Sequence, residues 1–270
     1  MVLFYRNLIM PTNNNSRRNF ITKTAIAGIA AAGFTNTATF AASHFETAKK
    51  TDHLNFLFQG DSITDGNRGR NQDPNHIMGH GYAFSIASRV GETFAEKQNH
   101  FFNRGISGNK ITDLEKRWQT DTLDLKPDVL SILVGINDTD SVVRNQNVVT
   151  AEKYEAVYHS LLTQTRTQLP DCILVLCEPF ILPVGKVKEN WTLFNDDLQK
   201  RQQAVLRLSK EFKTIFVPLQ KVFNDAVSRA SNEYWMWDGI HPTYSGHELI
   251  TKEWIKQLSK ELRFLKRIKL

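Results

Sequence analysis

The sequence has few cysteines, little net charge outside its N-terminus and no long apolar run. Only Cys172 and Cys177 occur among 270 residues, five positions apart in one apolar segment. An odd separation along a strand places two side chains on opposite faces, about 16 Å apart. A disulfide needs Cα atoms within about 7 Å, so we expect two buried thiols and no disulfide.

The charge excess is confined to the N-terminus. Four of the 34 basic residues and none of the 28 acidic ones fall within the first 42 residues, so the remainder carries a net charge of only +2. A nearly neutral domain gives no electrostatic reason to expect a nucleic acid or an anionic membrane as a partner.

The first 42 residues have the pattern of an export segment. Ser16–Lys23 resembles a twin-arginine signal, an apolar run follows from Ala25 to Phe34, and small residues continue to Ala42. The apolar run of about ten residues is shorter than the roughly 20 that span a membrane, and no cysteine near the cleavage site offers a lipid anchor. We predict an export signal at 1–42 and one domain at 43–270, placed in the periplasm or secreted. A basic tail is the alternative, Met10 is a second candidate start, and N-terminal sequencing of exported protein distinguishes these readings.

The rest of the chain alternates short apolar runs with amphipathic stretches. We predict strands at 54–58, 101–103, 128–134, 172–177 and 214–217, and helices at 81–97, 111–125, 150–170, 193–212, 220–231 and 245–262. Apolar strands separated by helices indicate a parallel sheet covered on both faces, which is a three-layer α/β/α sandwich. Ligands of such sheets bind beyond the carboxyl ends of the strands, so functional residues should directly follow strands.

Four short blocks occupy such positions. Gly60-Asp61-Ser62 follows the first strand, 103–108 follows the second, 135–138 follows the third, and 238–241 precedes the last helix. A doubly wound sheet can bring all four together at one edge.

The residue types in these blocks suit acyl transfer. A serine hydroxyl such as that of Ser62 is a weak nucleophile until a base takes its proton. His241 can be that base, and Asp238 can hold the second ring nitrogen. The oxyanion that forms needs donors already in place, for which we select the N–H groups of Ser62 and Gly105 and the amide of Asn137. Gly105 lacks a Cβ, which permits close approach of a substrate.

Together the blocks resemble the signature of the SGNH, or GDSL-like, hydrolases, a family named after Ser, Gly, Asn and His. Ser62, Gly105, Asn137 and His241 match the four letters, and Asp238 matches the Asp-x-x-His block. The resemblance covers about 54–260. It implies a flavodoxin-like fold with a five-stranded parallel sheet, a Ser-His-Asp mechanism, and no metal or other cofactor.

A narrower resemblance points to bacterial acetylxylan esterases of this family, through Asp113-Leu114, Arg117-Trp118 and 126–129 beside the blocks after the second and third strands. It implies an esterase acting on O-acetyl groups of plant-type carbohydrates such as xylan. Relatives assemble, so a homo-oligomer is left open. Close members carry an aromatic residue soon after the Asn-Asp pair, whereas Thr139-Asp140 follows it here. This difference affects the expected sugar pocket. A lysophospholipase or thioesterase with the same triad is the alternative, although no lid-like apolar segment supports long acyl chains; a non-catalytic carbohydrate-binding protein is a second.

Several further residues are candidates for either a functional or a structural role. Trp235 and Trp237, beside Asp238, are either walls for a sugar ring or packing over the core. Asp61, Asp138 and His247 are expected to brace the structure rather than to catalyse. His76 and His80 lack the His-Glu-x-x-His spacing of a zinc site, and Arg117 and Trp118 are expected to be structural.

Overall fold

The computed structural model describes residues 53–71 and 73–270. The predicted export signal at 1–42 lies outside the described residues, as does the beginning of the predicted domain at 43–270. Within the described part, none of the helices is both long and apolar enough to cross a membrane.

Five strands form one parallel sheet in the order β2-β1-β3-β4-β5. The strands are β1 (Asn55–Gly60), β2 (His100–Asn103), β3 (Val129–Leu133), β4 (Ile173–Cys177) and β5 (Ile215–Val217). The predicted sheet is confirmed, with strand limits displaced by one or two residues. In the register, Phe58 pairs with Asn103 on one side, and Gly60 pairs with Leu133 on the other. The carboxyl ends of β1, β2 and β3 therefore meet at one edge.

All six predicted helices are present, and shorter ones occur between them. The helices are α1 (Ser62–Asp65), α2 (Tyr82–Thr93), α3 (Ile111–Trp118), α4 (Ile136–Val143), α5 (Ala151–Gln168), α6 (Gly185–Glu189), α7 (Trp191–Glu211), α8 (Leu219–Ala226), α9 (Asn232–Trp235) and α10 (Tyr244–Leu258). A π-helical turn, Gln119–Leu123, continues α3. The sequence does not predict α1, α4, α6 and α9, because one or two turns are too short to display a 3.6-residue period.

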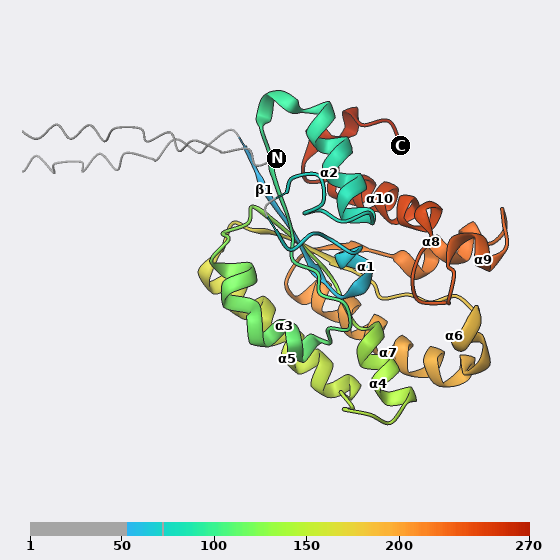
Figure 1. The fold of residues 1–270 in the computed structure, drawn as a ribbon. Coiled ribbons are helices and arrows are strands. Elements are labelled where there is room, and N and C mark those ends of the chain that lie inside the picture. The colour runs from blue at the N-terminus through green and yellow to red at the C-terminus, as the bar shows by residue number, and fades with distance from the viewer. Residues whose placement is uncertain (1–52, 72) are drawn as a thin grey trace, which may run out of the picture. The chain divides into compact units, whose positions relative to one another are not determined.

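Alternation along the strands divides the core between the two faces of the sheet. Phe56 and Phe58 cluster with residues of α2, α8 and α10, whereas Leu57 clusters with residues of α3, α5 and α7. Figure 1 shows these two groups of helices on opposite sides of the sheet. All three side chains are fully buried, and each such burial stabilises the fold by roughly 1.5–3 kcal/mol. Cys172 and Cys177 are buried free thiols that belong to opposite faces, as predicted. The predicted three-layer sandwich is therefore confirmed.

Candidate active site

Ser62 stands at the first position of α1, directly beyond the end of β1. Asp61 caps this helix, because its Oδ1 accepts a hydrogen bond from the N–H of Ile63 at 3.0 Å. The chain therefore turns sharply from strand into helix and presents the Ser62 hydroxyl at the sheet edge.

Ser62, His241 and Asp238 form one continuous hydrogen-bond chain. The Oγ of Ser62 lies 2.8 Å from Nε2 of His241. Nδ1 of the same ring lies 2.7 Å from Oδ2 of Asp238. The other carboxylate oxygen accepts the N–H groups of His241 at 2.7 Å and Ile240 at 2.9 Å. These bonds fix the carboxylate, and the carboxylate fixes the ring.

The electrostatics of the Ser62–His241–Asp238 hydrogen-bond chain suit proton transfer. The hydrogen bond that Nδ1 of His241 donates to Asp238 raises the pKa of His241 above its ordinary value, and this outweighs the desolvation that lowers it. Burial alone would raise the pKa of Asp238, but hydrogen bonds from the His241 side chain and backbone and from Ile240 bring it below the ordinary value. An ionised carboxylate therefore stabilises the imidazolium that forms when the ring accepts a proton.

The segment that carries His241 is held from two sides. Met236 and Pro242 form an antiparallel bridge, and the N–H of Trp237 donates to the carbonyl of His241 at 3.2 Å. The carbonyl of Gly239 accepts from the N–H of Leu182, in the segment after β4, at 3.1 Å. The loop is thus attached to the sheet edge.

Gly105 does not occupy the role that the sequence predicts for it. Its N–H donates to Oδ1 of Asn103 at 2.9 Å, so this donor is engaged by the protein. A Cβ at this position would lie 2.3 Å from the backbone nitrogen of Asp65. The glycine is therefore required for close packing of its loop against α1, and not for approach of a substrate.

The unobstructed position belongs instead to Gly108, which the sequence does not single out. It has a φ of +84°, and a Cβ there would meet nothing within 4 Å. Among the described residues its N–H has no acceptor. The preceding Ser107 is anchored on α1, because its N–H and Oγ donate to Oδ2 of Asp65 at 3.0 and 2.9 Å. Its positive φ requires a structure to be seen, so no sequence signal separated it from Gly105.

Asn137 lies in the first turn of α4, immediately after β3. Its Nδ2 donates to the carbonyl of Asn109 at 3.1 Å, which leaves the second amide hydrogen available. The neighbouring Asp138 is fully buried and accepts the N–H of Ile111 at 3.2 Å. Burial raises the pKa of Asp138 to about 6, despite the opposing charge of Arg201. Asp138 thus braces the start of α3, as predicted.

The two tryptophans before Asp238 differ in their exposure to solvent. Trp235 is only 6% exposed, belongs to the core and lies against the guanidinium of Arg229. The suggestion that it forms a substrate wall is therefore corrected: Trp235 packs in the core. Trp237 is 67% exposed, and its ring stacks beside that of His241 with centroids 6.1 Å apart. Trp237 remains a candidate for contact with a substrate.

Two of the other candidate histidines, His247 and His76, have contacts within the protein. Nδ1 of His247 accepts the N–H of Tyr82 at 3.1 Å, and burial lowers the pKa of His247 to about 4. Nδ1 of His76 lies 2.7 Å from Asp73 on an exposed loop. Across residues 53–71 and 73–270, no three or more His, Cys, Asp or Glu side chains are grouped so that they could hold a metal ion.

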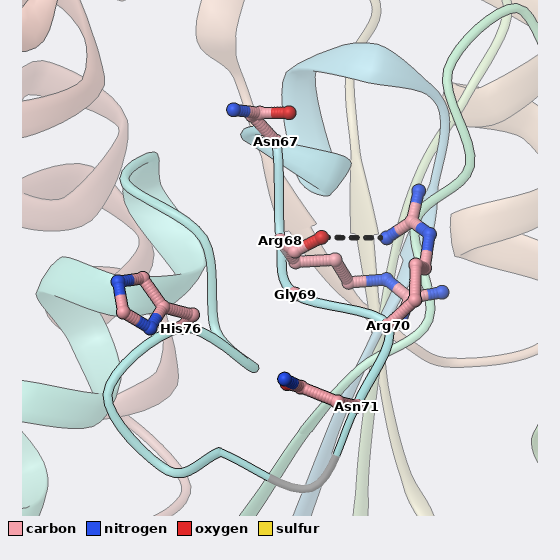
Figure 2. Close-up of a pocket in the computed structure, with 6 residues that line it drawn as sticks. All are labelled: Asn67, Arg68, Gly69, Arg70, Asn71 and His76. Atoms are coloured by element: carbon pink, nitrogen blue, oxygen red, sulfur yellow. Dashed lines mark hydrogen bonds between the residues drawn. The ribbon is translucent and has the colours of Figure 1, made fainter. Parts of the chain in front are cut away.

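The loop after α1 borders a surface hollow of about 620 Å³ (Figure 2). It is lined by Asn67, Arg68, Gly69, Arg70, Asn71 and His76. Arg70 pairs with Asp65 at 2.7 Å and donates to the carbonyl of Arg68 at 3.2 Å. Neither Ser62 nor His241 lines this hollow, so we interpret the arginine pairing as a brace for the loop beside the nucleophile helix.

Asp61 is expected to make the stability of the fold pH-dependent. It is fully buried, Oδ2 has no hydrogen-bond partner among the described residues, and burial raises its pKa from 3.8 to about 7. The folded state therefore binds an additional proton between about pH 4 and pH 7, and stability falls as pH rises through this window. Asp61→Asn removes that dependence and keeps the cap.

Urea unfolding at pH 5 and pH 8 measures this effect. The free energy of unfolding of Asp61→Asn relative to the native chain should increase by about 3 kcal/mol between the two pH values. Asp225→Asn, an exposed carboxylate on α8, serves as the control and should show no such increase. Parallel pH curves for the native chain and Asp61→Asn would contradict a neutral buried Asp61.

Comparisons with known proteins show which family this chain is similar to. A model of the GDSL-like lipase/acylhydrolase family matches residues 58–249, a span that contains Ser62, Asn137, Asp238 and His241. An acetylxylan esterase from Geobacillus stearothermophilus is 29% identical over 211 residues, which cover 76% of this chain and 94% of that protein. The predicted resemblance is confirmed.

Solved structures agree with the sequence comparison. A protein from Parabacteroides merdae ATCC 43184, described as GDSL-like, superimposes with a TM-score of 0.72 at 40% identity, over 76% of this chain and 94% of that one. The Geobacillus acetylxylan esterase gives a TM-score of 0.67 at 27% identity with the same coverage. Two further structures of that esterase carry alanine at a serine and at an aspartate, and both are described as catalytic mutants.

Proposed function

This chain belongs to the GDSL-like lipase/acylhydrolase family and is a carboxylic ester hydrolase, and we propose that it removes O-acetyl groups from oligo- or polysaccharides by a serine mechanism. The observation that carries the proposal is the unbroken hydrogen-bond chain from the Ser62 hydroxyl through His241 to Asp238. The catalytic serine and aspartate of the Geobacillus relative support the same assignment.

In this mechanism Nε2 of His241 accepts the proton of Ser62 while Oγ attacks the acetyl carbonyl carbon. The tetrahedral intermediate collapses, and the sugar alcohol leaves with the proton from His241. Water, deprotonated by the same ring, then attacks the acyl carbon; the bond to Oγ breaks, acetate leaves, and His241 returns the proton to Ser62. Asp238 remains ionised and keeps Nδ1 protonated throughout.

The oxyanion requires donors that exist before the reaction begins. We assign this role to the N–H of Ser62, the N–H of Gly108 and the free amide hydrogen of Asn137. Gly108 replaces Gly105, whose N–H is bound to Asn103. The position of Gly108 between Ser107, which is anchored on α1, and Asn109, whose carbonyl binds Asn137, supports this assignment.

The substrate class rests on the relatives and on one exposed side chain. The Geobacillus relative is an acetylxylan esterase, and the indole of Trp237 presents a broad apolar surface beside His241. Aromatic faces of this kind suit the apolar faces of sugar rings. An acetylated carbohydrate, such as xylan, is therefore the proposed substrate.

A chain-length series of p-nitrophenyl esters, together with acetylated xylan, pectin and sialic acid, tests this proposal. We expect kcat/KM to be highest for the acetyl ester and to fall with every longer acyl chain, and acetate to appear from at least one acetylated carbohydrate. Rising kcat/KM towards long acyl chains would instead identify a lipid esterase with the same triad. Tight carbohydrate binding without any turnover would identify a binding protein.

A further inference from the structure

Arg117 on α3 reaches the ends of two strands at once. Its Nε donates to Oδ1 of Asn109 at 2.9 Å, and Nη1 donates to Oε1 of Gln59 at 2.8 Å and to the carbonyl of Arg104 at 2.7 Å. Nη2 donates to the carbonyl of Gly60 at 3.3 Å. The side chain is only 14% exposed, so these bonds are made largely away from water.

The acceptors belong to the two segments that the reaction must hold in register. Gly60 ends β1 and precedes Asp61 and the nucleophile. Arg104 and Asn109 lie at the two ends of the loop between β2 and α3, which contains Gly108. One planar guanidinium therefore fixes the nucleophile segment and the oxyanion segment relative to each other.

A further hydrogen bond connects this arrangement to Asn137. The carbonyl of Asn109, whose side chain is held by Arg117, accepts Nδ2 of Asn137 at 3.1 Å. The direction of the remaining amide hydrogen of Asn137 follows from the position of that carbonyl. The loop is thus fixed at Ser107 by Asp65 and at Asn109 by Arg117.

The charges around Arg117 keep it in place. Asp121, in the π-helical turn after α3, accepts from Nη1 at 3.1 Å and lies 4.0 Å from Nε of Arg104. The ion pair orients the guanidinium along α3, and the remaining donors are free to bind neutral acceptors. A lysine has three donors on one nitrogen and cannot reproduce this fork.

We propose that Arg117 is a positioning residue of the oxyanion hole, acting through Asn109 on the Asn137 amide. The proposal rests on the serine mechanism proposed above. A displacement of about 1 Å at a remote position can cost about 10²-fold in rate, and oxyanion donors act mainly on kcat. Loss of the fork should therefore lower kcat more than it changes KM.

A double-mutant cycle on p-nitrophenyl acetate tests the coupling. Asn137→Ala should lower kcat roughly 10²- to 10³-fold, and Arg117→Lys roughly 10- to 100-fold, with KM within about threefold of the native value. The double variant should be no slower than Asn137→Ala by more than about threefold, because residues that act through one donor are not additive. Asn109→Ala, which keeps every other Arg117 contact, should reproduce the kcat loss.

Arg207→Lys is the matched control. Arg207 pairs with Glu155 through two hydrogen bonds on the exposed surface between α7 and α5, and its substitution should leave kcat unchanged. Thermal unfolding shows whether each variant is folded, and Asn109→Ala decides the outcome if Arg117→Lys is not. Native-like kcat in folded Arg117→Lys and Asn109→Ala, or fully multiplicative losses in the cycle, would overturn the proposal. Failure of the serine mechanism itself would appear differently, as activity retained by Ser62→Ala.

Discussion

Replacement of Ser62 by alanine is expected to remove the esterase activity, with a fall in kcat of roughly 10⁵- to 10⁶-fold. Among residues 53–71 and 73–270, the hydroxyl is the only hydrogen-bond partner of Nε2 of His241, at 2.8 Å, and without it no acyl-enzyme forms. The hydroxyl makes no other side-chain hydrogen bond among the described residues, so the variant should fold normally. Acetate release from p-nitrophenyl acetate and from acetylated xylan measures the loss.

Two observations make the Ser62 experiment decisive. A fluorophosphonate should label the native chain at Ser62 and leave the alanine variant unlabelled. Ser88→Ala, which removes an exposed hydroxyl on α2, should retain both labelling and activity. If Ser62→Ala released acetate at more than about a hundredth of the native rate, the nucleophile would have to be sought elsewhere.

The sequence predicted the architecture because the strands are short and almost entirely apolar. The run from Val129 to Leu133 is buried at every position, a pattern that leaves little choice but a central parallel strand. Once the strands are known, the rule that ligands bind beyond their carboxyl ends brings Ser62 and Asn137 to one edge. The position of the loop at 238–241 is less constrained, because this block does not follow a strand: a doubly wound sheet permits it to join the others, and the family resemblance implies that it does.

The wrong predictions share a physical cause. Each concerns a group that the fold has already hydrogen-bonded or buried, so that it is not available to a substrate. Gly105 and Gly108 are equally suitable in sequence, and the choice depends on the Asn103 side chain, which satisfies the N–H of Gly105. Trp235 and Trp237 are two residues apart, yet one packs in the core and the other faces solvent. The short helix α9 ends at Trp235 and the chain becomes extended at Met236, so no single period relates the two side chains.

Arg117 illustrates the same limit at longer range. Helical spacing predicts that it lies on a helix, and the expectation of a structural role is consistent with its contacts. Spacing does not indicate that the guanidinium reaches Gly60, 57 positions earlier in the chain. Long side chains at the sheet edge thus carry information about the site that only the folded structure displays.

Asp238→Asn is expected to lower kcat about 10⁴-fold while leaving the fold intact. The amide oxygen can still accept the N–H groups of Ile240 and His241, as Oδ1 of the carboxylate does. The amide nitrogen, however, is a donor towards Nδ1 of His241. The ring must then carry its proton on Nε2, which faces Ser62, and in that tautomer it cannot accept the serine proton.

The pH profile of the Asp238→Asn variant gives an independent readout. The hydrogen bond from His241 to Asp238 is the largest cause that raises the pKa of His241. Activity requires the neutral ring, so activity rises with pH through that pKa. In the variant the rise should move to lower pH, while the plateau falls. Asp196→Asn, an exposed change on α7, should alter neither. A plateau within about tenfold of the native value, or an acid limb at the native pH, would show that Asp238 does not control the protonation of His241.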